Sequence, residues 1–148
     1  MKTSAERKSE GAEIVELRVA ARPENVALAR LALNGVATAA GAPPAVVADL
    51  KLAVSEACTN AVQHAYASAN TDGDRHVVVR FAVQGRQLVV EVEDEGSGFE
   101  AVTRGFWEEG DAEGRGLGMG LTIVRSVTDD LAIESGALGS RVVFSKRF

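Results

Sequence analysis

Apolar and polar residues alternate along several stretches of the chain, which is the pattern of β-strands buried on one face. The longest such stretches flank a Gln84-Gly85 turn, and together they predict an antiparallel hairpin. A stretch near the N-terminus predicts a strand at the sheet edge, and two stretches around Gly136 and Gly139 predict a C-terminal pair. The five predicted strands cover residues 13–19, 77–83, 88–92, 131–135 and 140–148.

Apolar residues at helical spacing predict three helices. Pro23 suits the first turn of a helix that buries Leu33, and Pro43-Pro44 opens a second helix. A third amphipathic helix begins near Gly118. The three predicted helices cover residues 23–41, 44–67 and 118–129.

These elements follow the order β-α-α-β-β-α-β-β, with a long segment before the third helix. The order predicts an α+β fold, a two-layer α/β sandwich in which helices cover one face of a mostly antiparallel sheet. The 148 residues can bury one hydrophobic core, so we expect a single domain over residues 13–148 after a disordered polar tail at residues 1–12. Residues 95–115 are rich in Gly, Asp and Glu with little periodicity, and a loop of that length is typical of a functional lid.

Composition narrows the class of protein. Hydrophobic residues make up 46% of the chain and charged residues 25%, with a net charge of −5, which is an ordinary globular balance. The basic residues are scattered rather than gathered into a stripe, so no direct nucleic-acid partner is expected. No apolar run approaches a membrane span, no signal peptide is present, and the single Cys58 fits a reducing compartment and a packing role. We therefore expect a cytoplasmic protein without a membrane partner.

Glu56 and Asn60 lie one turn apart on the second predicted helix, at the edge of its buried face. An amide oxygen from Asn60 can complete the oxygen shell of Mg²⁺ without adding charge beside a phosphate. Glu56 can accept a proton from an incoming nucleophile. Taken alone, however, a row of polar residues such as Glu56 and Asn60 is more typical of a solvent-exposed helix face. The apolar face of the helix is predicted to contain Leu50, Val54, Ala57 and Ala61.

A carboxylate and two glycines follow the second strand of the predicted hairpin. Asp94 can accept a hydrogen bond from an exocyclic amine such as that of adenine, and Gly96 and Gly98 allow a flat base to approach the backbone. A plain Asp-Gly turn is the alternative interpretation, and this motif alone does not decide between them.

The glycine-rich segment before the third helix is more informative. Eight of the fifteen glycines lie between residues 96 and 120. Gly114, Gly116, Gly118 and Gly120 precede an amphipathic helix, whose free N–H groups and dipole attract phosphate. The segment lacks the Gly-Lys-Ser/Thr of a P-loop, and it follows a loop rather than the strand of a Rossmann motif. A flexible start to the helix is the alternative.

In chain order the three motifs are Ser55-Glu-Ala-Cys-Thr-Asn60, Asp94-Glu-Gly-Ser-Gly98 and Gly116-Leu-Gly-Met-Gly120. Together they resemble the motifs of the GHKL ATPase superfamily, and more narrowly the bacterial anti-sigma factor serine kinases of stress response and sporulation. The resemblance covers residues 13–148 and implies a Bergerat-type, histidine-kinase-like ATPase fold that binds ATP and Mg²⁺.

The resemblance implies a role for each matching residue. Glu56 would be the general base, Asn60 would hold Mg²⁺ and Asp94 would recognise adenine. Ser140 would place its hydroxyl near adenine. Arg115 would contact phosphate or a partner, although a solvated lid arginine is an equally open alternative. The other nucleotide-binding positions implied are Gly96, Gly98, Gly116, Leu117, Gly118, Met119 and Gly120.

Two functional hypotheses follow. The resemblance implies a serine/threonine protein kinase that phosphorylates a small STAS-type anti-sigma factor antagonist, sequesters a sigma factor and forms a homodimer. The alternative is a nucleotide-dependent binding module without appreciable kinase activity, since only Glu56 supports catalysis. Sensor histidine kinases share the ATP-binding fold but carry a phosphoacceptor histidine on a helical domain, which residues 1–12 cannot supply.

Overall fold

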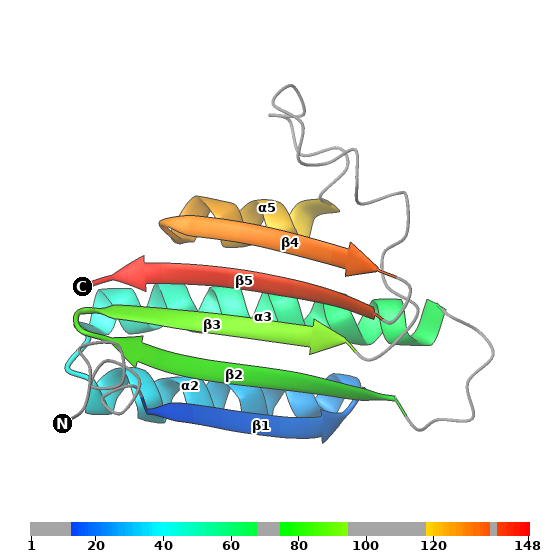
Figure 1. Cartoon of the computed structure of the whole chain (residues 1–148), viewed down its shortest axis with the longest axis horizontal. Coiled ribbons are helices and arrows are strands. Elements are labelled where there is room, and N and C mark those ends of the chain that lie inside the picture. Colours follow the sequence, from blue (N-terminus) through cyan, green and yellow to red (C-terminus); the bar gives the residue numbers. More distant parts are fainter. Residues whose placement is uncertain (1–12, 68–74, 95–117, 137–138) are drawn as a thin grey trace, which may run out of the picture.

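A five-stranded antiparallel sheet carries three helices on one face (Figure 1). The computed structural model describes residues 13–67, 75–94, 118–136 and 139–148. The strand order is β1-β2-β3-β5-β4, so β1 and β4 are the two edges. The strands are β1 (Ile14–Ala20), β2 (His76–Gln84), β3 (Gln87–Asp94), β4 (Asp130–Gly136) and β5 (Gly139–Arg147). The helices are α2 (Val26–Ala39), α3 (Pro44–Ala67) and α5 (Gly118–Val127), and a short 3₁₀ turn, η1 (Pro23–Asn25), precedes α2.

This arrangement confirms the predicted two-layer sandwich, with one difference in the first helix. The sequence predicts a continuous helix from Pro23, whereas the structure begins with the separate turn η1. Asn25 explains the break, because its side-chain amide donates a 2.7 Å hydrogen bond back to the carbonyl of Ala20. That bond fixes the path of the chain as it leaves β1, and regular α-helix starts only at Val26.

The core lies between the sheet and the helix layer. Alternate residues of β2, β3 and β5 point into it, including Phe81 and Phe144, which are almost completely buried. Burying a side chain of that size contributes about 1.5–3 kcal/mol, so these two rings anchor the middle of the sheet. The predicted apolar face of α3 is confirmed. All four of its members are buried: Leu50, Val54, Ala57 and Ala61.

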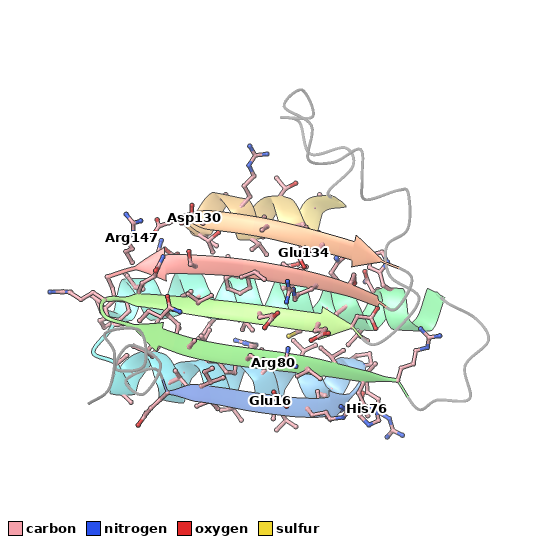
Figure 2. The ribbon with its side chains drawn as sticks, viewed as in Figure 1. Glu16, His76, Arg80, Asp130, Glu134 and Arg147 are labelled. Atoms are coloured by element: carbon pink, nitrogen blue, oxygen red, sulfur yellow. The ribbon has the colours of Figure 1, made fainter. Side chains whose placement is uncertain are left out.

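Arg80 occupies the middle of a charged row on the face of the sheet that the helices leave open (Figure 2). Its guanidinium bonds to carboxylates on both neighbouring strands. The Nε atom lies 2.9 Å from Glu16 on β1, and Nη1 lies 2.7 Å from Glu93 and 3.4 Å from Glu91 on β3. The hydrogen bond to Glu93 is the largest of the effects that raise the pKa of Arg80.

Arg141 of β5 extends this row toward the other edge. Its Nη1 lies 2.8 Å from Glu91, and its Nη2 pairs with Glu134 on β4. The hydrogen bond to Glu134 is the main cause of the raised pKa of Arg141. Opposite charges therefore alternate across all five strands, and the ladder fixes their register on the side without a hydrophobic cover.

Lys146 joins the C-terminal strand to the helix layer. Its ammonium donates a 2.9 Å hydrogen bond to the carbonyl of Val127, the last residue of α5, and lies 3.4 Å from the carboxylate of Asp49 on α3. A cation at a helix C-terminus satisfies an orphan carbonyl and opposes the helix dipole. Lys146 thus anchors the C-terminal end of α5. The first turn of α5, at the opposite end of the helix, lies at the candidate site. No helix in the described part of the chain is long and apolar enough to cross a lipid bilayer.

Candidate functional site

The structure places Glu56 and Asn60 on the central helix of the layer. α3 packs against α2 on one side, against α5 on the other, and against β3 and β5 beneath. Glu56 and Asn60 are half-buried and lie one turn apart, at the margin of the helix face that enters the core. The buried side of α3 fixes the rotation of the helix, so these two polar groups are held in one orientation.

The first turn of α5 meets Glu56 directly. A Cβ atom built on Gly120 would lie 2.9 Å from Oε2 of Glu56, closer than real Cβ contacts allow. Its next contacts are the Cβ and backbone oxygen of Glu56, each at 3.8 Å. Only glycine lets α5 approach α3 this closely with the carboxylate in this place. Two residues from motifs on either side of the β2–β3 hairpin therefore lie next to each other.

Asn60 presents a buried amide at the same face. Its Nδ2 atom is buried and has no hydrogen-bond partner among the described residues. A buried amide nitrogen without a partner costs about 1–3 kcal/mol, so such a group is expected to serve a ligand. A half-turn of the amide about its terminal bond exchanges the nitrogen for the oxygen, which could then face a cation. This observation fits the predicted role of Asn60.

Asp94 and Ser140 lie directly opposite each other where β3 ends and β5 begins. Both point to the helix-covered side of the sheet, in register with Val77 of β2. Asp94 is 2% exposed and Ser140 is 4% exposed, and both carboxylate oxygens of Asp94 are buried. A buried carboxylate beside a hydroxyl forms a polar spot in an otherwise apolar row, where it can accept hydrogen bonds from a ligand.

These parts gather toward one end of the molecule. In Figure 1 the C-terminal end of β3, the start of β5, the second half of α3 and the start of α5 all lie toward the right-hand side. α5 begins at Gly118, which has a φ of +72°, a conformation that favours glycine. The first N–H groups of the helix have no intrahelical partner. They can bind an anion such as a phosphate.

Five of the predicted site residues lie outside the described residues, as does the predicted lid at residues 95–115. Met119 is described and is 83% exposed in the first turn of α5. The five residues whose placement stays a prediction are Gly96, Gly98, Arg115, Gly116 and Leu117.

Other titratable groups near the site have different roles. Burial raises the pKa of the Cys58 thiol to about 12, which suits the packing role predicted for it and leaves no reactive thiolate. Burial lowers the pKa of His64, which favours the neutral imidazole. Among the described residues, no group of three or more His, Cys, Asp and Glu side chains could hold a metal ion.

Sequence reasoning missed a groove on the other flank of α3. It has a volume of about 530 Å³ and runs between α3 and the start of α2. Ser55 and Thr59, the neighbours of Glu56 and Asn60, line it from α3, and Arg30 lines it from α2. The spacing of Ser55 and Thr59 was visible as a polar helical stripe, but only the packing of α2 onto α3 turns that stripe into the wall of a groove.

The sequence of this chain is similar to those of a known ATPase domain family and of several bacterial protein kinases. The histidine kinase-like ATPase domain family matches residues 19–146. The serine-protein kinase RsbW of Bacillus pumilus is 35% identical over 147 residues, which cover 93% of this chain and 88% of that protein. The serine-protein kinase RsbW of Listeria monocytogenes is 38% identical over 125 residues, covering 80% of this chain and 78% of that protein.

Two solved structures share the fold. The crystal structure of the RsbU and RsbW domains of Rv1364c from Mycobacterium tuberculosis superposes with a TM-score of 0.68 at 23% identity, covering 91% of this chain and 32% of that chain. The histidine kinase domain of a blue-light activated histidine kinase from Erythrobacter litoralis EL346 gives a TM-score of 0.58 at 23% identity, covering 87% of this chain and 61% of that chain.

Proposed function

The chain belongs to the histidine kinase-like ATPase domain family and, within it, to the serine-protein kinases RsbW, and from this we propose that it is an ATP-dependent protein serine/threonine kinase. The family predicted from the three sequence motifs is thereby confirmed. The roles of individual residues are proposals, and each is supported by a feature of the described site.

We assign the adenine end of ATP to Asp94 and Ser140. A buried carboxylate can accept a hydrogen bond from the exocyclic amine of adenine, and the hydroxyl opposite it can donate or accept one more. The apolar residues beside them, such as Val77, suit a flat aromatic base. The triphosphate would then extend toward the first turn of α5, where free N–H groups favour its charge.

Asn60 is the proposed protein ligand of Mg²⁺. The residues fit this ion, because the buried Nδ2 atom of Asn60 has no hydrogen-bond partner in the described part of the chain, and a half-turn of the amide would set the oxygen at that position. Mg²⁺ usually keeps water and substrate phosphates in its shell, so one neutral ligand from the protein is sufficient. When bound, the ion would neutralise charge on the phosphates.

Glu56 is the proposed general base. A serine hydroxyl of the substrate protein attacks the γ-phosphorus of ATP, and the bond from that phosphorus to the β–γ bridging oxygen breaks to release ADP. The hydroxyl proton passes to the carboxylate of Glu56. The observation that supports this assignment is the close approach of Glu56 and Gly120, because the carboxylate thereby lies beside the helix start that would hold the phosphates.

We propose that the substrate is a small STAS-type anti-sigma factor antagonist and that the chain also sequesters a sigma factor as a homodimer. The support for these partners is the shared family with the serine-protein kinases RsbW. Since sigma factors act on RNA polymerase, the same proposal places the chain in the cytoplasm.

The decisive experiment measures phosphate transfer. The full chain is incubated with radiolabelled ATP, Mg²⁺ and purified candidate antagonists of the STAS class, and Mg-ATP affinity is measured by calorimetry in parallel. Glu56→Gln should lower the transfer rate by about a hundredfold or more while retaining nucleotide affinity. Glu13→Gln makes the same chemical change at an exposed site outside the proposed active site and should leave the rate unchanged. Full activity in Glu56→Gln would remove the proposed base.

A second candidate function requires no catalytic residue. Asp94, Asn60 and the start of α5 would be sufficient to bind the nucleotide. In this alternative the chain is a switch that captures a regulator in the presence of ATP without phosphorylating it. Nucleotide-dependent capture combined with no transfer to any antagonist would select it. Both functions fail if calorimetry detects no binding of Mg-ATP to the wild-type chain.

A further inference from the structure

The sandwich is open at one end, between β1 and α2. Val15 of β1 pairs with Phe81 of β2, so both side chains point to the side of the sheet that the helices cover. Phe81 is completely buried, whereas Val15 is 41% exposed. Val83, the next inward-facing residue of β2, is only half-buried. α2 therefore leaves part of the apolar side of the sheet uncovered here, as a groove of about 640 Å³.

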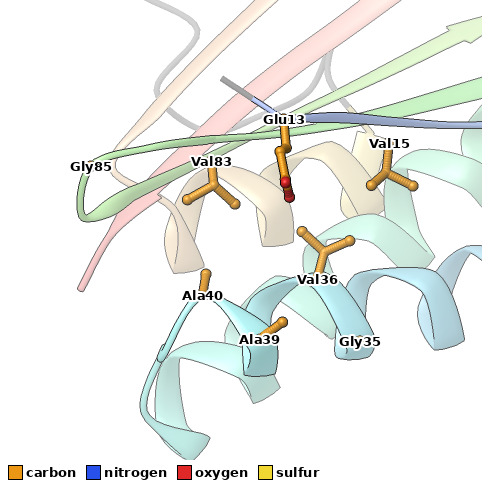
Figure 3. Close-up of a pocket in the computed structure, with 8 residues that line it drawn as sticks. All are labelled: Glu13, Val15, Gly35, Val36, Ala39, Ala40, Val83 and Gly85. Carbon is orange, nitrogen blue, oxygen red and sulfur yellow. The ribbon is translucent and has the colours of Figure 1, made fainter. Parts of the chain in front are cut away.

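The walls of this groove are apolar and come from both layers (Figure 3). Val15 and Val83 line it from the sheet, and Val36 and Ala39 line it from the C-terminal half of α2. Small residues on the helix keep the space open. Gly35 also lines the groove, and a Cβ atom built on it meets nothing within 4 Å. Small-molecule sites have volumes of about 300–1,000 Å³ and mostly apolar walls, so this groove has the size and lining of such a site.

One carboxylate faces this apolar space. Continuing the β1–β2 register by one residue sets Glu13 opposite Val83, on the inward-facing side of the sheet. Figure 3 shows the Glu13 carboxylate pointing between the strands and α2. No hydrogen bond or ion pair joins this carboxylate to another of the described residues. Arg86, in the adjoining turn, donates its Nε–H to the carbonyl of Phe148 instead. The groove thus combines apolar walls with a negative charge that no described cation neutralises.

The lining residues discriminate against other kinds of ligand. Mg²⁺ and Ca²⁺ need several oxygen ligands, whereas Glu13 carries the single carboxylate among the described residues of the groove. An anion would be repelled, since none of the described lining residues is Lys, Arg or His. A purely apolar molecule would take water away from the carboxylate without replacing its hydrogen bonds, which is costly.

We propose that the groove between β1 and α2 binds a small organic monoamine in its protonated form. The ammonium group pairs with Glu13, and a compact aliphatic or aromatic body lies against Val15, Val36 and Val83. Burial of the body supplies most of the affinity, because it scales with the apolar area removed from water. An ion pair at a partly exposed site contributes less. Glu13 therefore determines the charge of the ligand rather than the strength of binding.

This site lies far from the candidate nucleotide site. The groove adjoins the turn at Gly85, just before β3 begins, and Asp94 is the last residue of β3. A strand of eight residues is about 25 Å long, so the two sites are at opposite ends of the sheet. Amine binding is measured without nucleotide. It can therefore hold or fail independently of the phosphate-transfer experiment.

Titration of the full chain with phenethylamine at about pH 7, where the amine is protonated, tests the site. NMR of the valine methyl groups follows the titration, with phenethyl alcohol as the neutral control of similar shape. The methyl signals of Val15, Val36 and Val83 should shift, and the amine should bind about three- to tenfold more tightly than the alcohol. An amine that shifts none of these signals, or that binds no more tightly than the alcohol, would overturn the proposal.

Substitutions assign the two kinds of contact. Glu13→Gln keeps the size of the side chain but removes its charge, so the amine and the alcohol should bind equally. Glu24→Gln makes the same change at an exposed residue of η1 outside the groove and should keep the preference for the amine. Ala39→Leu extends an exposed side chain into the groove and should weaken both ligands at least about tenfold. An undiminished preference in Glu13→Gln, or undiminished binding in Ala39→Leu, contradicts the assigned site.

The same titration at two chain concentrations separates the amine from a second copy of the chain as the occupant. A constant affinity with one amine bound per chain supports the proposal. An affinity that falls as the chain concentration rises would mean that a second copy covers the groove, and the proposal would then be wrong.

Discussion

The carboxylate of Glu56 occupies the space that a side chain at position 120 would need. Its Oε2 atom lies 2.9 Å from the place of a Cβ atom on Gly120. These residues are on different helices and belong to two of the three sequence motifs. The absence of a side chain on α5 and the position of the acid on α3 are therefore one structural feature, from which the first prediction follows.

Gly120→Ala should reduce phosphate transfer at least about tenfold, because the new methyl group displaces the Glu56 carboxylate and small misplacements of a catalytic group are costly. The stability of the fold should change little, since the atom nearest to the new methyl group is the end of a flexible side chain. Alanine also favours a helix over glycine by about 1 kcal/mol. Steady-state kinetics and urea unfolding of the same preparation measure both effects.

Gly35→Ala provides the matched control for this variant. Gly35 lies in α2, and a Cβ atom there meets nothing within 4 Å. The same substitution should therefore keep full activity while raising the free energy of unfolding by up to about 1 kcal/mol. Equal losses of activity in the two alanine variants would show that the Glu56 contact is not the cause.

Asp94→Asn should weaken Mg-ATP binding at least about tenfold. The carboxylate is buried at the end of β3, and the substitution removes the negative charge that strengthens its hydrogen bond with the adenine amine and leaves a single acceptor oxygen. Ser140→Ala removes only one hydroxyl opposite Asp94 and should cost about two- to tenfold. Calorimetry measures both. A larger loss in Ser140→Ala than in Asp94→Asn would contradict the proposed adenine contact.

Cys58 makes the stability of the chain depend on alkaline pH. Burial raises its pKa from 9.0 to about 12 in the folded state. Above pH 9 the unfolded chain loses this proton while the folded chain keeps it, so stability is complete below pH 9 and falls as the pH rises toward 12. At about pH 10.5 the loss should be about 2 kcal/mol.

Urea unfolding of the wild type and of Cys58→Ala at about pH 8 and about pH 10.5 measures this effect. The alanine variant is less stable at both values because it leaves a small cavity, but its stability should fall less between them. An identical pH dependence in the two chains would refute the role of Cys58.

Arg80→Met should destabilise the fold by about 1–3 kcal/mol, because it leaves three neighbouring carboxylates without their shared cation. The loss should shrink in high salt, which screens the repulsion among the carboxylates. Arg80→Lys should recover only part of the stability, since an ammonium lacks the planar fork that reaches both neighbouring strands. Urea unfolding at two salt concentrations provides the measurement.

Arg125→Met is the comparison for Arg80→Met. Arg125 is exposed on α5, so its loss should change the stability by no more than about 0.5 kcal/mol. A small, salt-independent effect in both variants would mean that the ladder on the open face contributes little to the fold.

Most of the fold could be predicted from hydrophobic spacing. All five strands and three helices lie within a few residues of their predicted bounds, and the buried face of α3 was assigned correctly at Leu50 and Ala61. The short turn η1 was missed because it depends on a hydrogen bond from Asn25 to Ala20, which no periodicity reveals. The pairing of Arg80 with Glu16 was likewise invisible, since it depends on the strand order.

The candidate site, like the fold, was only partly predictable from the sequence. The sequence alone was enough to predict that Glu56 and Asn60 share one helix face, because helical geometry fixes the relation between residues one turn apart. The contact of Gly120 with Glu56 and the pairing of Asp94 with Ser140 follow only from the tertiary structure. Contacts between distant residues depend on how helices pack and strands pair, and the local sequence does not set those distances.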